Sequence, residues 1–113
     1  MDCIFCKIIA GEIPARKIYE TDHIIVIRDI NPEAPVHDLI IPKKHIKDLN
    51  DLDDIEMAAD ILISAKKIAK IEGVEKSGYR LISNTGRNGG QLIPHLHFHL
   101  LGGKKLGPKL VQE

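Results

Sequence analysis

The stretch His95-Leu96-His97-Phe98-His99-Leu100-Leu101 decides the fold, because histidines alternate in it with apolar residues. Side chains two positions apart on a β-strand share a face and lie about 6.6–7 Å apart. We therefore expect a strand over residues 95–101, with three imidazoles on one face and apolar side chains in a core. A neutral imidazole can serve as nucleophile, proton carrier or metal ligand, whereas packing alone favours Val or Ile. The alternative is a satisfied polar face without chemistry.

The composition of the chain is typical of one compact globular domain, expected over residues 1–113. A domain of this size buries about two thirds of its unfolded surface without needing disulfides. Sixteen basic and sixteen acidic residues leave no net charge, whereas proteins that bind nucleic acids or membrane surfaces are usually basic. The start of the chain has no secretory signal pattern, and no run of about eighteen apolar residues occurs. These features predict a soluble, cytoplasmic protein with no nucleic-acid or membrane partner.

Short β-branched runs predict four more strands, and two segments predict helices. The expected strands are 16–20, 24–28, 36–42, 79–84 and 95–101, and the expected helices are 4–10, ended by Gly11, and a long one from 51–56 to Gly73. Strands grouped with a single long helix, without alternating βαβ units, are typical of an α+β fold. The sequence therefore predicts a five-stranded, mainly antiparallel sheet with one short and one long helix.

The long helix has an apolar stripe that is wider than one small sheet needs to cover it. Its members recur at three- and four-residue spacing, and they are Ile55, Ala58, Leu62, Ala65 and Ala69, with Ile61 and Ile68 beside them. This excess predicts that the helix also contributes to a homodimer interface.

Cys3 and Cys6 are the only cysteines, in the spacing Cys-x-x-Cys. In a reducing compartment such a pair is more often a metal chelate or a redox dithiol than a structural disulfide. A redox role requires a thioredoxin-like βαβ context, which does not follow here. The pair can supply half of the Cys₂His₂ set that structural zinc prefers. Two buried free cysteines are the alternative.

Together with the glycine-rich segment 85–91 and the run Val36–His45, the triad resembles the histidine triad family of nucleotide-binding proteins. The resemblance covers nearly the whole chain. Asp29-Ile30-Asn31-Pro32 and Gly102-Gly103 resemble the branch of purine nucleoside phosphoramidases and related bacterial hydrolases. That branch implies a homodimer in which two five-stranded antiparallel sheets join into one of ten strands. The third triad residue is His99 rather than glutamine, which argues against the nucleotidyl transferase branch.

The resemblance implies a catalytic role for three histidines and no organic cofactor. His97 is expected to attack the α-phosphorus of a nucleoside phosphoramidate or other nucleotide conjugate, and water then hydrolyses the nucleotidyl-histidine intermediate. His99 is expected to contact the phosphate or aid the leaving group, and His37 to orient or relay. For His37, a merely polar strand residue is the alternative. The attacking ring must be neutral, with a backbone carbonyl of the triad strand as the expected partner of its other nitrogen.

The resemblance also implies how a purine nucleotide is bound, with either base accepted by an apolar pocket that includes Ile18 and Ile27. Loop residues are expected around the phosphate, and Asp29 and Ile30 at the ribose, although Asp29 could instead begin a turn. Leu92 stands where the branch commonly has serine, so a hydroxyl donor to the leaving group is missing. The expected binding residues are Asp29, Ile30, Asn84, Gly90, Gln91, Leu92, His97 and His99.

Resemblance to zinc-carrying bacterial members adds His45 and His95 to Cys3 and Cys6 as ligands of a structural zinc. This assigns the first histidine of the triad to structure and the second to catalysis. Two rival functions stay open. One is a zinc hydrolase whose triad holds a catalytic metal, although the terminal rings of a regular strand lie roughly 13 Å apart. The other is a nucleotide-binding or interaction module with vestigial hydrolysis, to which Leu92 gives weight.

Overall fold

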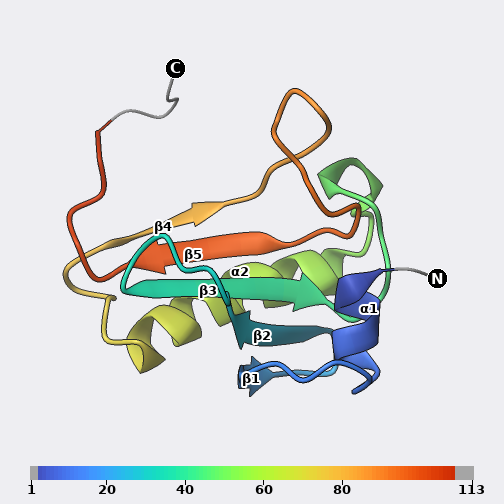
Figure 1. Cartoon of the computed structure of the whole chain (residues 1–113), viewed down its shortest axis with the longest axis horizontal. Helices are drawn as coiled ribbons and strands as arrows, with labels where there is room; N and C mark the ends of the chain where they lie inside the picture. Colours follow the sequence, from blue (N-terminus) through green and yellow to red (C-terminus); the bar gives the residue numbers. More distant parts are fainter. Residues whose placement is uncertain (1–2, 109–113) are drawn as a thin grey trace.

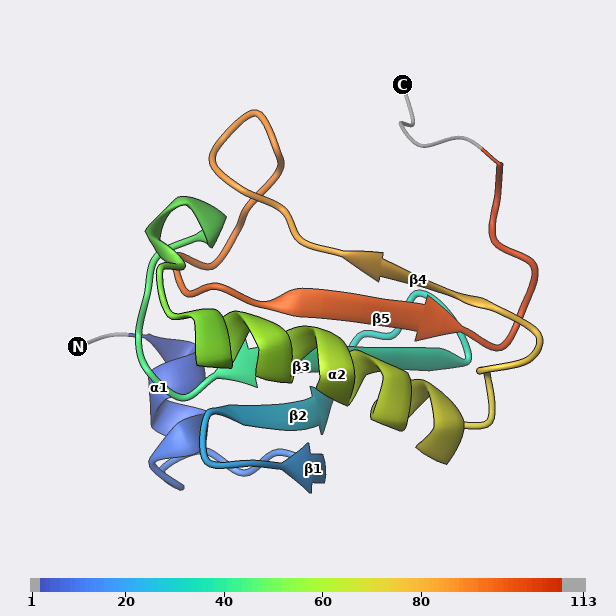
Figure 2. The ribbon, with the colours of Figure 1, turned by 180° about the vertical axis from the view of Figure 1, so that it is seen from behind.

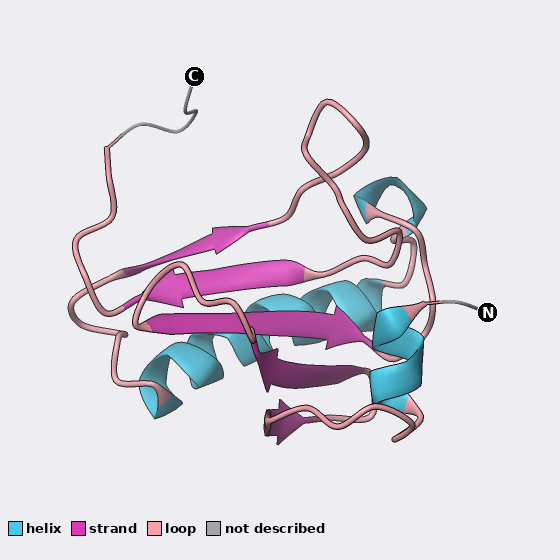
Figure 3. Cartoon of the chain, in the orientation of Figure 1, coloured by secondary structure: helices cyan, strands magenta, loops and turns pink. Residues whose placement is uncertain are grey.

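The computed structural model describes residues 3–108, so residues 1–2 and 109–113 of the expected domain lie outside the described part. The elements in chain order are α1 (Ile4–Ile9), β1 (Lys17–Glu20), β2 (Ile24–Arg28), β3 (Val36–Pro42), a 3₁₀ turn η1 (Leu49–Asp51), α2 (Ile55–Ile71), β4 (Tyr79–Ile82) and β5 (Phe98–Gly102). The strands form one sheet in the order β1-β2-β3-β5-β4, and all neighbouring pairs are antiparallel (Figure 3). The predicted α+β fold is confirmed. No helix within residues 3–108 is both long and apolar enough to span a membrane.

The two helices lie on opposite faces of the sheet. The long helix α2 crosses one face (Figure 2), and the short helix α1 lies against one end of the other (Figure 1). Because strand side chains alternate between faces, Val26, Ile40 and Leu100 pack with α2. Ile27 and Leu39 instead pack with α1. The sheet therefore has one apolar cluster on each face, each fully buried aliphatic side chain contributing about 1.5–3 kcal/mol.

The long helix begins and ends at residues that satisfy its terminal groups. The N-cap is Asp54, whose Oδ1 accepts a hydrogen bond from the Met57 backbone N–H at 3.1 Å. Gly73 follows the helix with a φ of 76°, a left-handed conformation that favours glycine. The sheet does not cover the whole predicted apolar stripe, since Ile55 and Leu62 are 83% and 57% exposed. The buried face is rotated toward Met57, Ile61, Ser64, Ala65, Ile68 and Ala69.

The predicted strand over 95–101 is wrong at its start, since β5 begins only at Phe98. The β3–β5 pairing ends at Ile40 and Phe98, and Pro42, two residues further along β3, has no N–H to donate to a ladder. The chain before β5 bonds to loops instead: the Leu96 N–H donates to the Ile46 carbonyl at 2.8 Å. The side chains still alternate, because Leu96 is 1% exposed in the α2-side cluster.

A buried acidic pair occupies the α2 side of the sheet, which the sequence analysis did not anticipate. Asp38 on β3 is fully buried beside Glu72, the C-cap residue of α2. Glu72 also accepts a 2.9 Å salt bridge from Arg28. Burial and then the Glu72 carboxyl raise the pKa of Asp38 to about 7, against the opposing effect of Arg28. Below about pH 7 Asp38 is therefore protonated beside Glu72, under the end of the helix.

Candidate active site and metal cluster

A cavity of about 610 Å³ lies on the face of the sheet that α1 covers only in part. All the predicted binding residues line it, namely Asp29, Ile30, Asn84, Gly90, Gln91, Leu92, His97 and His99. Ile27 of the predicted base pocket lines it as well. Ile18 does not, because it packs against the α2-side cluster. The cause is a register irregularity between Lys17 and Tyr19, which changes the face that a strand residue occupies.

The glycine-rich loop before the triad is held together by its own amide side chains. Gly90 has a φ of 79°, and a Cβ on Gly89 would lie 2.3 Å from the Thr85 carbonyl oxygen, so both positions require glycine. The Asn84 side chain donates to the Gly89 carbonyl at 2.7 Å. The Gln91 side chain accepts from the Gly86 N–H and donates to the Lys47 and Ile93 carbonyls. These two amides therefore hold the loop at the cavity.

His97 is oriented by the backbone of the triad itself. Its Nδ1 lies 2.8 Å from the His95 carbonyl oxygen. A carbonyl can only accept, so Nδ1 carries the proton and the lone pair of the neutral ring is on Nε2. His97 is 8% exposed and lines the cavity. The expected backbone-carbonyl partner is confirmed, and it fixes the tautomer in which Nε2 can act as a nucleophile.

His37 and His99 form a hydrogen-bonded chain whose direction is also fixed. The Glu33 backbone N–H donates to His37 Nδ1 at 3.1 Å, so the proton of the neutral His37 ring is on Nε2. That atom lies 2.9 Å from His99 Nδ1 and 3.4 Å from the Asp29 carboxylate. His37 therefore donates to His99, and the remaining proton of His99 is on Nε2.

Burial, followed by the neighbouring His97 and His37, lowers the pKa of His99 to about 4. Asp29 and Glu33 oppose this shift but do not cancel it. His99 is consequently a neutral hydrogen-bond donor near pH 7. Its ring centre lies 5.1 Å from that of His97, so both rings face the same cavity.

Asp29, His37 and His99 also offer three potential metal-binding atoms within 4.8 Å of one another. The tautomer chain argues against a metal there. The Glu33 N–H occupies the lone pair of His37 Nδ1, which places a proton on the Nε2 atom that a metal would need. Ligating imidazole must present a free lone pair, so this group is a hydrogen-bonding chain rather than a chelate.

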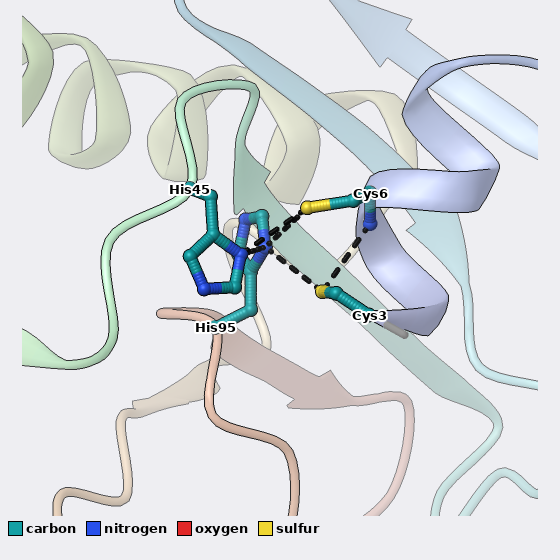
Figure 4. Close-up of side chains that lie close together, drawn as sticks. All are labelled: Cys3, Cys6, His45 and His95. Atoms are coloured by element: carbon teal, nitrogen blue, oxygen red, sulfur yellow. Dashed lines mark hydrogen bonds between the residues drawn. The ribbon is translucent and has the colours of Figure 1, made fainter. Parts of the chain in front are cut away.

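The second cluster brings together all four predicted zinc ligands (Figure 4). Cys3 and Cys6 come from the start of α1, His45 follows β3, and His95 precedes β5. The Cys3 and Cys6 sulfurs lie 3.3 and 3.6 Å from His95 Nδ1. His45 Nδ1 lies 3.2 Å from the Cys6 sulfur and 3.1 Å from His95 Nδ1.

These distances fit the edges of a zinc tetrahedron. Zinc–sulfur bonds of about 2.3 Å and zinc–nitrogen bonds of about 2.0–2.1 Å give edges of about 3.6 Å between nitrogen and sulfur and about 3.4 Å between nitrogens. His95 Nε2 lies 2.8 Å from the Pro42 carbonyl and donates to it, which leaves the lone pair on Nδ1. Burial lowers the pKa of His95 and so keeps that atom unprotonated. The donor set fits a structural metal site with four protein ligands.

The chain is similar to known proteins over nearly its whole length. The family model of the HIT domain matches residues 10–106. The chain is 48% identical over 114 residues to the purine nucleoside phosphoramidase of Escherichia coli (strain K12), covering 99% of this chain and 96% of that protein. A crystal structure of a HIT family hydrolase from Legionella pneumophila is 51% identical, with a TM-score of 0.91, covering 95% of this chain and 97% of the other. A histidine triad protein from Clostridium difficile is 48% identical, with a TM-score of 0.92 and 96% of each chain covered. The chain therefore belongs to the HIT domain family.

Proposed function

We propose that this protein is a hydrolase that cleaves nucleoside 5′-phosphoramidates or related nucleotide conjugates through a covalent nucleotidyl-His97 intermediate. The observation that carries the proposal is the 2.8 Å contact from His97 Nδ1 to the His95 carbonyl, because it leaves the Nε2 lone pair available to the cavity. The 48% identity to a protein named as a purine nucleoside phosphoramidase supports the same chemistry.

In the first step, Nε2 of His97 forms a bond to the α-phosphorus, and the bond from phosphorus to the amine nitrogen breaks. A phosphorus–nitrogen bond is exchanged for another, so neither side of the step is steeply favoured. In the second step, water attacks the same phosphorus and releases the nucleoside monophosphate and neutral His97. The proton on His97 Nδ1 stays on that nitrogen throughout, hydrogen-bonded to the His95 carbonyl.

The role of His99 follows from its tautomer. His37 holds it as a neutral ring with the proton on Nε2, which suits it to donate a hydrogen bond to a phosphoryl oxygen as charge develops there. The leaving amine then takes its proton from water at the open side of the cavity, where Leu92 is 93% exposed. His37 acts through His99 and is a positioning residue.

We further propose that zinc binds to Cys3, Cys6, His45 and His95 as a structural ion. All four positions of a tetrahedron are then filled by protein atoms, with no open position for substrate or water. When bound, the ion ties α1 to the sheet. Two cysteine ligands without a disulfide suit a reducing, cytoplasmic setting.

A homodimer is the proposed assembly. The outer side of α2 and its ends expose apolar side chains, at 83% for Ile55, 57% for Leu62, 48% for Ile63 and 56% for Ile71. β4 is an edge of the sheet and so has backbone groups available for pairing with a second copy. Two sheets joined at this edge would make ten strands. A monomeric mass by light scattering at micromolar protein would contradict this assembly.

The test of the activity is hydrolysis of adenosine 5′-phosphoramidate by the pure protein, in parallel with His97→Ala, measured as release of nucleoside monophosphate. We expect turnover by the wild type and a loss of at least about 10³-fold in the variant, since the nucleophile is removed. A nucleotide-binding module is the second candidate, favoured by Leu92 in the place of a hydroxyl donor. Binding of adenosine 5′-monophosphate without any turnover of its amidate would establish it.

A further inference from the structure

We propose that the metal cluster and the nucleotide cavity are thermodynamically coupled, and that Phe5 is the positioning residue that carries the coupling to His97. The proposal rests on the proposed function only in taking a nucleoside monophosphate as a ligand of the cavity. Two separate links between the cluster and His97 support it.

The first link runs through His95. Its Nδ1 faces the two cysteine sulfurs, and its Nε2 donates to the Pro42 carbonyl at 2.8 Å. Its backbone carbonyl, in turn, accepts a hydrogen bond from His97 Nδ1. One residue is therefore both a cluster ligand and the group that orients the nucleophile. A metal that fixes the His95 ring restricts the backbone to which His97 is bonded.

The second link runs through Phe5, which stands between Cys3 and Cys6 on α1. Its side chain is 4% exposed. The centres of the Phe5 and His95 rings lie 5.8 Å apart, and the ring planes make an angle of 90°, an edge-to-face arrangement. The centre of the Phe5 ring also lies 5.0 Å from that of the His97 ring, with an angle of 67° between the ring planes. Such edge-to-face pairs depend on ring orientation. Phe5 therefore contacts the nucleophile from the same helical turn that carries both sulfur ligands.

The turn that carries Phe5 is the part of the cavity wall that a metal would order. Ile4, Phe5 and Ile8 of α1 line the cavity, while Cys3 and Cys6 anchor the helix to His45 and His95. Without a metal, sulfur–nitrogen contacts of 3.2–3.6 Å and apolar packing of α1 against the sheet hold this anchor. A bound metal fixes α1, and α1 fixes the Phe5 ring against His97. A ligand that needs this arrangement binds more tightly when the metal is present.

The experiment measures the affinity for adenosine 5′-monophosphate by calorimetry, in zinc-loaded protein and in protein treated with a chelator. We expect binding to be about 5–10-fold tighter in the zinc-loaded protein, within the usual range of coupling between two sites. Linkage is reciprocal, so the nucleotide must raise the zinc affinity by the same factor. A competing chromogenic chelator measures that second affinity. Equal nucleotide affinity in the two forms overturns the proposal.

Phe5→Leu tests the route, with Ile8→Ala as the matched control. Both residues lie on α1 and line the cavity, but of the two only Phe5 has ring contacts to His95 and His97. We expect Phe5→Leu to reduce the zinc dependence of nucleotide binding to less than about twofold. Ile8→Ala should weaken nucleotide binding equally in the zinc-loaded and the chelator-treated protein. The ratio of the two affinities should then stay as in the wild type. Full coupling in Phe5→Leu overturns the role of Phe5.

A spectroscopic readout separates this inference from the proposed function. If the nucleotide binds to neither form, the proposed function fails. The inference is then decided by the ring-proton resonances of His97, which lie near the Phe5 ring. They are expected to shift when zinc is added to the wild type and to shift much less in Phe5→Leu. If the His97 resonances of the wild type do not shift on addition of zinc, the inference is overturned, whatever the protein hydrolyses. This outcome does not depend on whether the variant folds.

Discussion

The two faces of the sheet differ in what covers them. On one face, the 17 residues of α2 cover a continuous apolar cluster that includes Ile40, Leu96 and Leu100. On the other, the six residues of α1 cover only one end, and the remainder is a cavity lined by His97 and His99. The same strands supply both faces by alternation. We therefore expect stability to depend mainly on the α2 face and the proposed chemistry on the α1 face.

Two neighbouring residues of β5 show the difference between the two faces most directly. Leu100 is fully buried on the α2 face, whereas His99 faces the cavity and bonds to His37. Substitutions one position apart should therefore separate stability from turnover. If they do not, the two faces are not independent.

The largest expected loss of stability is that of Leu100→Ala. Removing a fully buried leucine side chain costs about 2–5 kcal/mol, because a cavity remains in the cluster. Urea unfolding measures this change. Turnover at 25 °C should stay within about twofold, provided that the variant is folded. A fall in turnover as large as that expected for His99→Ala would show that the two faces are coupled.

His99→Ala should have the opposite profile. Loss of a hydrogen-bond donor to a phosphoryl oxygen is expected to lower kcat by about 10²–10³-fold. The free energy of unfolding should change by less than about 1 kcal/mol. Steady-state kinetics and urea unfolding of the same preparation check both. Unchanged kcat with an intact fold would remove His99 from the proposed reaction.

The buried pair of Asp38 and Glu72 makes the stability of the α2 face depend on pH. The pKa of Asp38 is raised in the folded protein, from 3.8 to about 7, so folding favours its protonated form. The associated stability is complete below the ordinary pKa and is lost as pH rises through about 7. Asp38→Asn, a neutral isostere, should stabilise the protein at pH 8 by about 2 kcal/mol and change it little at pH 4.

Urea unfolding of both proteins across pH 4–8 tests the Asp38 prediction. Parallel stability curves for the wild type and Asp38→Asn would show that Asp38 is not the titrating group. Because Asp38 lies on the α2 face, kcat should be unaffected by the substitution at each pH. His37, the preceding residue, points to the opposite face and bonds to His99.

The smallest expected effect is that of Leu92→Ser on the rim of the cavity. Leu92 is 93% exposed, so the free energy of unfolding should change by less than about 0.5 kcal/mol. A hydroxyl near the leaving group should raise kcat/KM for amine conjugates by up to about tenfold. A nucleotide ester with a better leaving group serves as the control and should gain less. Equal gains on both substrates would contradict a role at the leaving amine.

Much of the fold could be predicted because local patterns and tertiary packing agree. The β-branched runs at 24–28 and 36–42 became β2 and β3 at the predicted bounds. The alternation from His95 onward predicted the correct faces, although the backbone ladder begins later. Pro42 of β3 has no N–H to extend the β3–β5 ladder, so the start of β5 is set by a residue of a different strand. A pattern within one segment cannot show it.

The parts of the site that could not be predicted depend on groups without a sequence signature. The backbone N–H of Glu33 sets the tautomer of His37, and any residue except proline has such a group. The partners His37 and His99 are 62 positions apart. Asp38 resembles an ordinary polar strand residue until Glu72 is placed beside it. The position of Phe5 does have a sequence signal, because Phe5 stands between the two cysteines of the Cys-x-x-Cys motif. A side chain between two members of a cluster lies close to the other members, here His45 and His95.

The central claim, that the α1 face carries nucleophilic chemistry at His97, is tested most directly by trapping the intermediate. The wild type is mixed with a nucleoside 5′-phosphoramidate and quenched under conditions that preserve phosphorus–imidazole bonds, and the peptide containing residues 95–99 is analysed by mass spectrometry. We predict a nucleoside monophosphoryl group on His97 that forms and decays at the rate of turnover. Turnover without any adduct on His97, or an adduct on another residue, would contradict the account.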